Sequence, residues 1–349
     1  MTAIRPLEPS AGDAPGSLAA PAVSDGAWRR HHLLDLDSFS ADELELVMAT
    51  TDAMNEILRR EVPRVPALRG TTIVTLFYEN STRTRASFEL AAKVLGADVI
   101  NVASASSSVT KGESLVDTVK TLQAVGADVL VMRHGRSGAP YLAARHAECS
   151  VVNAGDGLHA HPTQALLDLF TMRAAFGDVR GRRVVIVGDV LHSRVARSNI
   201  WSLTTLGADV TVCAPTTLLP AGLSRHLEGQ LPNVRVETDL DRAIVDADVV
   251  MALRMQNERM HGGFVPGARE YSRLYQVNAT RLARAKPGAL VMHPGPMNEG
   301  VEISHEVAHG LQSHVEEQVQ NGVAVRMAVL WLITRGNTRQ ARAAAKGAL

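Results

Sequence analysis

Short apolar runs alternate with longer helix-type stretches along most of this chain. Each run has the length of a buried strand, and each stretch between two runs is long enough for a helix. Strands that alternate with helices typically form parallel sheets with helices on both faces. The sequence therefore predicts the α/β class. The expected strands are residues 72–77, 97–102, 128–132, 150–153, 183–188, 208–213, 248–253 and 289–292, and the expected helices are 83–95, 113–125, 139–146, 162–175, 194–206, 280–285 and 315–334.

The length of the chain favours two domains, each a mostly parallel sheet flanked by helices. The chain has 349 residues, and a single core stops growing near about 250–300 residues. A polar turn at 177–181 precedes the apolar run 183–188 and starts a second α/β unit, with helix 162–175 as the link. We expect a disordered tail at 1–27, a first domain at 28–161, a second at 162–314, a C-terminal helix packing back on the first domain at 315–335, and a tail at 336–349.

The composition narrows the range of partners. Lys plus Arg and Asp plus Glu both number 36, and this zero net charge argues against a general nucleic-acid or membrane-surface protein. No apolar run approaches the roughly 20 residues that span a bilayer, and the N-terminus lacks the apolar core of a secretory signal. Cys149 and Cys213 lie far apart in apolar contexts, which predicts buried free thiols. We therefore expect a cytoplasmic protein with no nucleic-acid or membrane partner.

The segment Ser81-Thr82-Arg83-Thr84-Arg85 lies between an expected strand and an expected helix. Backbone N–H groups at a helix N-terminus lack partners, and the helix dipole is positive there. Hydroxyl groups and guanidinium forks at such a position form an anion site, most naturally for a phosphate. One hydroxyl would be enough to cap the helix, so capping alone does not account for the cluster. The segment therefore points to a phosphorylated substrate.

Other cationic side chains follow expected strands. Arg133 comes directly after one strand, and Arg194 opens the helix after another. Arg254 and Gln256 follow a third strand and could clamp a carboxylate. Ligands of open α/β sheets bind outside the carboxyl ends of the strands, so these side chains share one rim with the 81–85 segment. The alternative is an ordinary surface position for Arg133 and an ordinary loop position for Arg254.

A glycine-rich turn leads into the helix that begins at Pro162, a residue suited to the first helical position. His161 could donate to a carbonyl oxygen there, and Gln164 could bind an amide, although a simple helix cap is the alternative for the histidine. His159 and His161 together could suggest a metal. No carboxylate or third histidine has ligand spacing in the sequence, so we predict no metal site.

Two further loops carry candidate ligand contacts. Lys111 is a point charge in a serine-rich loop and suits an anionic ligand, with an ordinary solvated loop as the alternative. The segment His293-Pro294-Gly295-Pro296 follows a strand, and its prolines predict a stiff loop whose carbonyls could face an amine. An X–Pro bond in such a turn can be cis.

Taken together, these segments resemble the catalytic chain of the aspartate carbamoyltransferase family. The resemblance runs in order from about residue 31 to residue 333. Its joint signature is Ser-Thr-Arg-Thr-Arg at 81–85, His-Pro-Thr-Gln at 161–164, Arg254-x-Gln256 and His-Pro-Gly-Pro at 293–296. The related ornithine carbamoyltransferases share the first signature but carry His-Cys-Leu-Pro late in the chain and a Ser-Met-Gly loop.

The resemblance implies a reaction and an assembly. The first domain would bind carbamoyl phosphate and the second L-aspartate, and no cofactor would be needed. The products would be N-carbamoyl-L-aspartate and phosphate, in pyrimidine biosynthesis. The active unit would be a homotrimer, because Ser107 and Lys111 of a neighbouring subunit would reach each site. Regulatory chains or a dihydroorotase could join a larger assembly.

The resemblance also assigns roles to single residues. Glu79 and Arg259 would form pairs that bridge the domains, and Arg85 would be a structural ion-pair residue. The implied catalytic residues are Thr84, Arg133 and His161. The implied carbamoyl phosphate contacts are Ser81, Thr82, Arg83, Thr84, Arg133, His161 and Gln164, and the implied aspartate contacts are Lys111, Arg194, Arg254, Gln256, Gly295 and Pro296.

Two other functions are compatible with the same residues. A non-catalytic chain could bind carbamoyl phosphate as a scaffold. A carbamoyltransferase for ornithine or another amino acid could share the phosphate segment, although two arginines suit a dicarboxylate better than an amine-bearing side chain.

Overall fold

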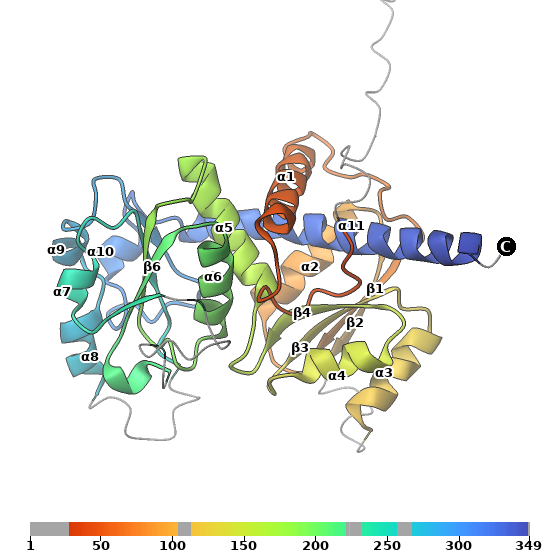
Figure 1. The fold of residues 1–349 in the computed structure, drawn as a ribbon, viewed down its shortest axis with the longest axis horizontal. Coiled ribbons are helices and arrows are strands. Elements are labelled where there is room, and N and C mark those ends of the chain that lie inside the picture. The colour runs from red at the N-terminus through yellow and green to blue at the C-terminus, as the bar shows by residue number, and fades with distance from the viewer. Residues whose placement is uncertain are drawn as a thin grey trace, which may run out of the picture.

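The computed structural model describes residues 28–103, 113–220, 223, 232, 234–256 and 267–347. Figure 1 shows two α/β units, each built on one sheet. The expected class is confirmed, because every strand pair in both sheets is parallel and helices flank each sheet.

The first unit contains a four-stranded sheet with strand order β2-β1-β3-β4. Alternate residues of central strand β1 enter two different cores, as in a sheet covered on both faces. Ile73 and Phe77 join the larger core beneath α2, whereas Val74 and Leu76 join a smaller core with residues of α3 and α4. The elements of this unit are α1 (Ala41–Leu58), β1 (Thr72–Phe77), α2 (Thr82–Val94), β2 (Asp98–Ala103), α3 (Leu115–Ala124), β3 (Val129–His134), α4 (Ala139–His146) and β4 (Ser150–Asp156).

The second unit contains a five-stranded sheet with strand order β7-β6-β5-β8-β9. Apart from Arg183 at the start of β5, strands β5 and β8 are apolar and buried, which is why they could be predicted. Edge strand β7 was not predicted, because it is three residues long and only partly buried. The elements are β5 (Arg183–Val187), α6 (Arg194–Thr205), β6 (Asp209–Cys213), the 3-10 turn η3 (Thr216–Leu218), β7 (Arg235–Glu237), α7 (Leu240–Ala243), β8 (Val249–Ala252), α8 (Ala268–Tyr275), α9 (Ala279–Leu282), β9 (Leu290–Met292) and α10 (His305–Ala308).

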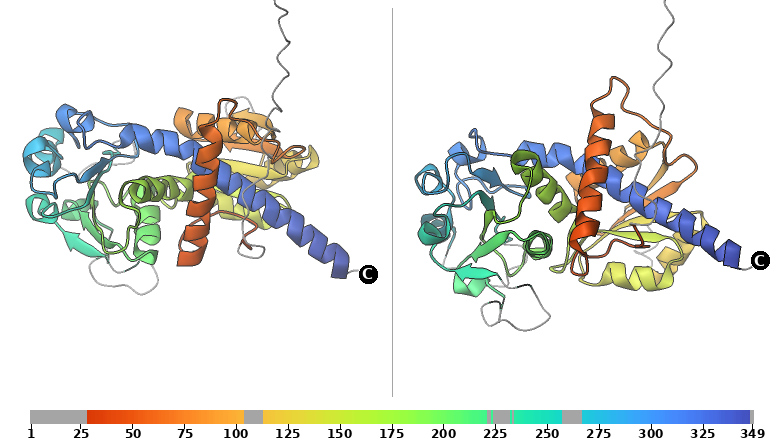
Figure 2. Two further views of the ribbon diagram at one scale, coloured as in Figure 1. Left: turned by 90° about the horizontal axis from the view of Figure 1, so that it is seen from above. Right: turned by 45° about the horizontal axis from the view of Figure 1, so that its top comes forward.

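Two helices connect the units. Helix α5 (Pro162–Phe176) is buried along most of its length and packs against α1, α6 and α11. Helix α11 (Val315–Gly347) starts beside the second sheet, packs against α5 and continues across α1 and α2 of the first unit, as Figure 2 shows. It extends past its expected end near residue 335, because the residues after Gly336 are mostly strong helix formers that do not terminate it.

Strand order fixes where a ligand can bind. In the first sheet β2 and β3 lie on opposite sides of β1, and in the second β6 and β8 lie on opposite sides of β5. The loops that leave such neighbouring strands diverge, and the resulting crevice is the usual ligand site of an open α/β sheet. The two crevices comprise the loops after β1 and β3 in one unit and the loops after β5 and β8 in the other.

Two further expectations concern the cysteines and the membrane. Cys149 and Cys213 are both buried free thiols, as predicted. In the part of the chain that the structure describes, none of the helices combines the length and the apolar character that crossing a bilayer requires.

Candidate active site

A cavity of about 660 Å³ lies where the crevices of the two units meet. Its walls come from the loops after β1, β5, β8 and β9, from Arg133 near the end of β3, from the start of α5 and from α11. Of the expected site residues, those within the described part of the chain all line this cavity. They are Ser81, Thr82, Arg83, Thr84, Arg133, His161, Gln164, Arg194, Arg254, Gln256, Gly295 and Pro296. Ser107, Lys111 and Arg259 lie outside the described residues.

The start of α2 forms one corner of the cavity. Ser81 is the N-cap, and its Oγ accepts from the Thr84 backbone N–H at 3.4 Å. Burial, and then the neighbouring Arg254, lower the pKa of Arg83, so two cations face each other across the units. A Cβ on Gly295 would collide with the Arg83 guanidinium, so only glycine allows this close approach. The corner combines helix N–H groups, hydroxyls and guanidiniums, which is the chemistry of a phosphate site.

Arg85 does not join this corner. Its guanidinium carbon lies 5.1 Å from the centre of the Phe77 ring, and its Nε has no hydrogen-bond partner. Among the described residues Arg85 makes a cation–π contact, and its expected role in a structural ion pair stays a prediction.

Glu79 holds two cavity arginines with one carboxylate oxygen. Its Oε2 lies 2.6 Å from Nη2 of Arg194 and 3.0 Å from Nη2 of Arg133. Because Arg194 begins α6 of the second unit, this pair is the bridge between units expected of Glu79. The same guanidiniums donate to backbone carbonyls, Arg133 to Ala154 at 3.1 Å and Arg194 to Gly157 at 3.3 Å. Both cations are thus fixed in orientation before any ligand binds.

His161 is a buried, neutral imidazole. Its backbone N–H donates to Ser198 Oγ at 2.9 Å, and within the described residues its Nδ1 has no hydrogen-bond partner. Burial, reinforced by Arg133 and Arg194, lowers the pKa of His161 well below its ordinary value. A neutral imidazole carries one N–H, so His161 can donate one hydrogen bond to a ligand carbonyl without adding charge.

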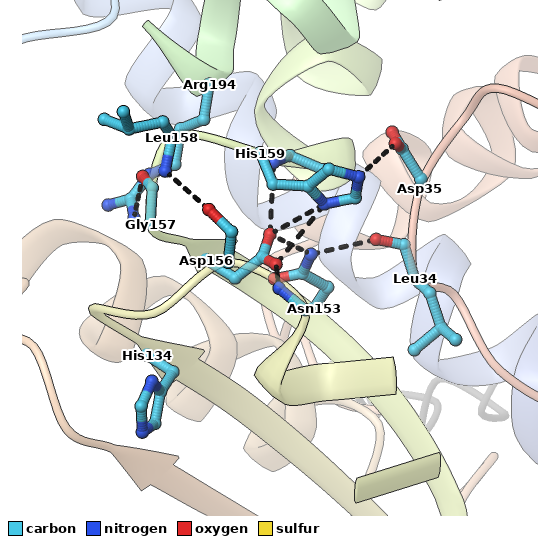
Figure 3. Close-up of polar contacts among 12 residues, drawn as sticks. Leu34, Asp35, His134, Asn153, Asp156, Gly157, Leu158, His159 and Arg194 are labelled. Carbon is cyan, nitrogen blue, oxygen red and sulfur yellow. Dashed lines mark hydrogen bonds and ion pairs between the residues drawn. The ribbon is translucent and has the colours of Figure 1, made fainter. Parts of the chain in front are cut away.

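The loop that leads to His161 is held by a buried carboxylate. Figure 3 shows Asp156 accepting from Asn153 Nδ2 at 2.8 Å and from the ring of His159 at 3.3 Å. The other ring nitrogen of His159 lies 3.4 Å from Asp35. Carboxylates near His159 were not recognisable from the spacing of the sequence, yet Asp35 and Asp156 both lie beside its ring. They lock the loop by hydrogen bonds and raise the pKa of His159, the bond to Asp156 contributing most.

A second buried carboxylate, Asp168 on α5, joins four elements of the site. Its Oδ1 accepts from Gln164 at 2.9 Å and from Gln318 of α11 at 2.7 Å, and its Oδ2 accepts from Asn199 of α6 at 2.8 Å. Gln318 Oε1 in turn accepts from the His293 N–H at 3.0 Å. Burial raises the pKa of Asp168 to about 6. One side chain therefore positions Gln164, α6, α11 and the loop after β9.

The loop after β9 is held by hydrogen bonds to the buried side chain of His293. His293 Nδ1 accepts from the Gly295 N–H at 2.8 Å, and its Nε2 lies 3.2 Å from Glu302, with both side chains buried. The Gly295–Pro296 peptide is cis, as the sequence allowed. Gln256 Nε2 donates to the His192 carbonyl at 2.9 Å and so ties the loop after β8 to the loop after β5.

Sequence reasoning missed Arg326, which reaches the cavity from α11. Its guanidinium carbon lies 5.2 Å from the Phe88 ring, and its Nη1 donates to the Gly322 carbonyl at 2.8 Å. Burial lowers its pKa to about 10, so it is still a cation at neutral pH. The available signal was a lone arginine within the apolar run 323–333, because arginine is rarely buried without a partner.

Comparisons with known proteins cover most of the chain. Residues 31–174 match the family model for the carbamoyl-P binding domain of aspartate/ornithine carbamoyltransferase. Residues 180–333 match the model for the Asp/Orn binding domain. The aspartate carbamoyltransferase catalytic subunit of Roseiflexus sp. (strain RS-1) is 59% identical over 306 residues, 88% of this chain and 96% of the relative. The catalytic subunit of Chloroflexus aggregans is 59% identical over 303 residues, 87% and 98% of the two chains.

Solved structures give the same picture of the fold. Aspartate transcarbamoylase from Trypanosoma cruzi, in complex with N-(phosphonacetyl)-L-aspartic acid, superposes with a TM-score of 0.77 at 31% identity, covering 86% of this chain and 94% of the other. Ornithine carbamoyltransferase from Thermus thermophilus superposes with a TM-score of 0.75 at 28% identity, covering 87% and 99%. The two-unit architecture is therefore common to proteins that act on different amino acids.

Proposed function

This chain belongs to the aspartate/ornithine carbamoyltransferase family, and on that premise we infer that it catalyses the aspartate carbamoyltransferase reaction. It transfers the carbamoyl group of carbamoyl phosphate to the amine of L-aspartate and releases N-carbamoyl-L-aspartate and phosphate. The observation that carries this function is a cavity in which the α2 phosphate corner of one unit faces guanidiniums of the other. Curated relatives at 54–59% identity bear the aspartate name.

The phosphate of carbamoyl phosphate binds at the start of α2. Ser81, Thr82 and Thr84 supply hydroxyl and backbone donors, and Arg83 supplies charge-assisted hydrogen bonds. The pKa of Arg83 is lowered first by partial burial and then by the neighbouring Arg254, which indicates that its charge is disfavoured by its surroundings. A phosphate dianion bound to Arg83 would relieve that cost.

The carbamoyl carbonyl is polarised by Thr84, Arg133 and His161. Arg133 is held by Glu79 and the Ala154 carbonyl, so it meets the substrate already oriented. His161 donates as a neutral group, and Gln164, fixed by Asp168, binds the carbamoyl amide. Donors that are fixed before the reaction stabilise developing charge without a reorganisation cost.

The aspartate carboxylates bind to Arg194, Arg254 and Gln256, with Lys111 as a further cation. The carbonyls of Gly295 and Pro296 receive the aspartate amine. In this arrangement the second unit supplies most of the aspartate contacts, and the first supplies most of the carbamoyl phosphate contacts. The division at residues 161 and 162 is therefore proposed as a functional boundary as well as a structural one.

The chemistry needs no group beyond these. The aspartate amine attacks the carbamoyl carbon, a C–N bond forms, and the carbonyl oxygen becomes an oxyanion held by Thr84, Arg133 and His161. The C–O bond to phosphate then breaks, and the departing phosphate accepts the amine proton. Both substrates are anions that repel in water, so bringing them together in a cationic cavity supplies much of the rate.

We propose that the chain forms a homotrimer. We also propose that this trimer works in the cytoplasm, in pyrimidine biosynthesis. Ser107 and Lys111 of a neighbouring subunit would complete each site. Leu90 on α2 and Ile100 on edge strand β2 are exposed apolar side chains on the first unit and support a contact there. The buried free thiols suit a reducing compartment. Regulatory chains or dihydroorotase are proposed as further partners of the trimer.

A steady-state assay separates an enzyme from a scaffold. Purified protein is incubated with carbamoyl phosphate and L-aspartate, and carbamoyl aspartate and phosphate are both measured. Equal amounts of the two products, with inhibition by N-(phosphonacetyl)-L-aspartate, are expected. Tight binding of carbamoyl phosphate without carbamoyl aspartate would support the scaffold instead.

A further inference from the structure

Glu299, His305 and His309 form a compact polar cluster on the surface of the second unit, outside the residues that line the cavity. Glu299 Oε2 lies 2.6 Å from His305 Nδ1, and its Oε1 lies 3.1 Å from His309 Nε2. The two imidazole centres are 4.6 Å apart. One donor atom from each side chain therefore lies within 4.8 Å of the other two.

The local fold builds this cluster. Ser304 caps α10, His305 is its first residue, and His309 follows its last, so the histidines are one turn apart on the same side. Glu299 comes from the turn before the helix, where the Gly300 N–H donates to the Ile303 carbonyl at 2.8 Å. The backbone thus aims a carboxylate at a pair of imidazoles.

The donor set matches a transition-metal site. Two imidazoles and a carboxylate are common ligands of Zn²⁺, with metal–ligand distances of about 2.0–2.2 Å and donors roughly 3.3 Å apart in a tetrahedron. The histidines lie 2.6 and 3.1 Å from the two different oxygens of Glu299, and the donor atoms all lie within 4.8 Å of one another, so side-chain rotations alone can bring them to that value. An ordinary surface ion pair would need only one of the histidines, whereas both converge on the same carboxylate.

We propose that Glu299, His305 and His309 bind one divalent transition-metal ion, with Zn²⁺ the best match, and that water fills the remaining position. The side chains are 36%, 81% and 53% exposed, so solvent competes and the affinity is of micromolar order rather than that of a buried structural zinc. Nothing in the transfer reaction requires this ion.

The ion would cross-link a segment that leads from the active site. Glu299 follows Asn298, whose backbone N–H donates to Glu302, and Glu302 in turn holds His293 beneath Gly295. Bound metal would fix the turn at 299–303 to α10 without contacting either substrate. Binding to the folded state alone raises the melting temperature with metal concentration, while kcat is expected to stay the same.

Metal binding is measured on the untagged, chelator-treated protein. Zn²⁺ is titrated by calorimetry and by competition with a chromophoric chelator, and one ion per chain is expected. The variants His309→Ala and Glu299→Gln should each lose at least about tenfold in affinity for this ion. The control is His146→Ala, which removes an exposed histidine on α4 and should leave binding unchanged.

Two results would overturn the site. One is Zn²⁺ affinity and stoichiometry in His309→Ala equal to those of the parent protein. The other is no saturable binding below about 1 mM, far weaker than two imidazoles and a carboxylate can achieve together. The buried thiols of Cys149 and Cys213 do not compete, and far-UV circular dichroism of each variant establishes that it is folded.

Discussion

At the scale of single residues, the cavity is lined by arginines, and some of their positive charge is left to bind an anionic ligand. Glu79 neutralises part of the charge of Arg133 and Arg194, while Arg83 and Arg254 face each other across the units. His161 adds a donor but no charge. These features divide the site into a carbamoyl phosphate half and an aspartate half that can be tested separately.

Replacing Arg254 should affect aspartate far more than carbamoyl phosphate. Arg254→Ala removes a charge-assisted contact to a carboxylate, worth roughly 1.5–3 kcal/mol, so KM for aspartate should rise about 10- to 100-fold. Carbamoyl phosphate affinity should change little, as measured by calorimetry. Arg235→Ala, at an exposed ion pair with Asp209, is the control. Loss of carbamoyl phosphate binding in Arg254→Ala would contradict this division of the site.

The raised pKa of Asp168 leads us to expect that the stability difference between Asp168→Asn and the parent protein depends on pH. Burial raises its pKa from 3.8 to about 6, so the folded protein binds this proton more tightly than the unfolded chain does. Its contribution to stability is therefore greatest at low pH and declines as pH rises from about 4 to 6. Asp168→Asn removes this titration. The unfolding free energy of the variant, relative to the parent, should increase from pH 4 to pH 6.5 in urea titrations.

A pH-independent difference between Asp168→Asn and the parent would show that the carboxyl is not strained by burial. The variant should also lower kcat, because an Asn amide cannot accept from Gln164, Gln318 and Asn199 together.

At the scale of elements, the strands and long helices were predictable from the sequence. Strands of a sheet that is covered on both faces are continuous apolar runs, and these runs are easily recognised. β1 matched its expected bounds, and α4 did too. β7, α7, α8 and α10 were not predicted, because each has at most two buried residues and so leaves little apolar pattern in the sequence. The strand-end rule placed Arg133, Arg194 and Arg254 around one cavity. Asp168, Gln318 and Arg326 were missed, because they come from helices and act through contacts distant in sequence.

Gly155 in β4 should be needed to keep the guanidiniums of Arg133 and Arg194 in position. Gly155 has φ +115°, and a Cβ there would lie 3.0 Å from the Arg194 guanidinium and 3.1 Å from that of Arg133. Gly155→Ala should therefore shift both guanidiniums by a few tenths of an ångström and lower kcat/KM by about tenfold, because catalysis depends on their orientation.

The control for this substitution is Gly126→Ala. Gly126 has φ +102° but faces open space, so the backbone strain is similar and nothing is displaced. We expect the two variants to lose similar amounts of stability. Only Gly155→Ala should also lose activity. Equal activities in both variants would mean that the arginines tolerate the displacement.

At the scale of the whole molecule, few polar contacts cross from one sheet to the other near the cavity, and Glu79–Arg194 is the shortest of those described. Glu79→Gln would leave two largely buried guanidiniums without their counter-ion. The variant should melt at a lower temperature than the parent, and inorganic phosphate should restore part of the difference by supplying negative charge. Glu89→Gln, at an exposed pair with Lys93, should show neither effect. A Glu79→Gln deficit that phosphate does not reduce would contradict this role.

The central claim, that this two-unit cavity joins carbamoyl phosphate to aspartate, is tested most directly by competition between acceptors. The protein is given limiting carbamoyl phosphate with equal concentrations of L-aspartate and L-ornithine, and the carbamoylated products are quantified by mass spectrometry. We predict carbamoyl aspartate in large excess, because Arg194 and Arg254 present two cations to the acceptor. Citrulline as the main product, or no carbamoylated product at all, would contradict the account.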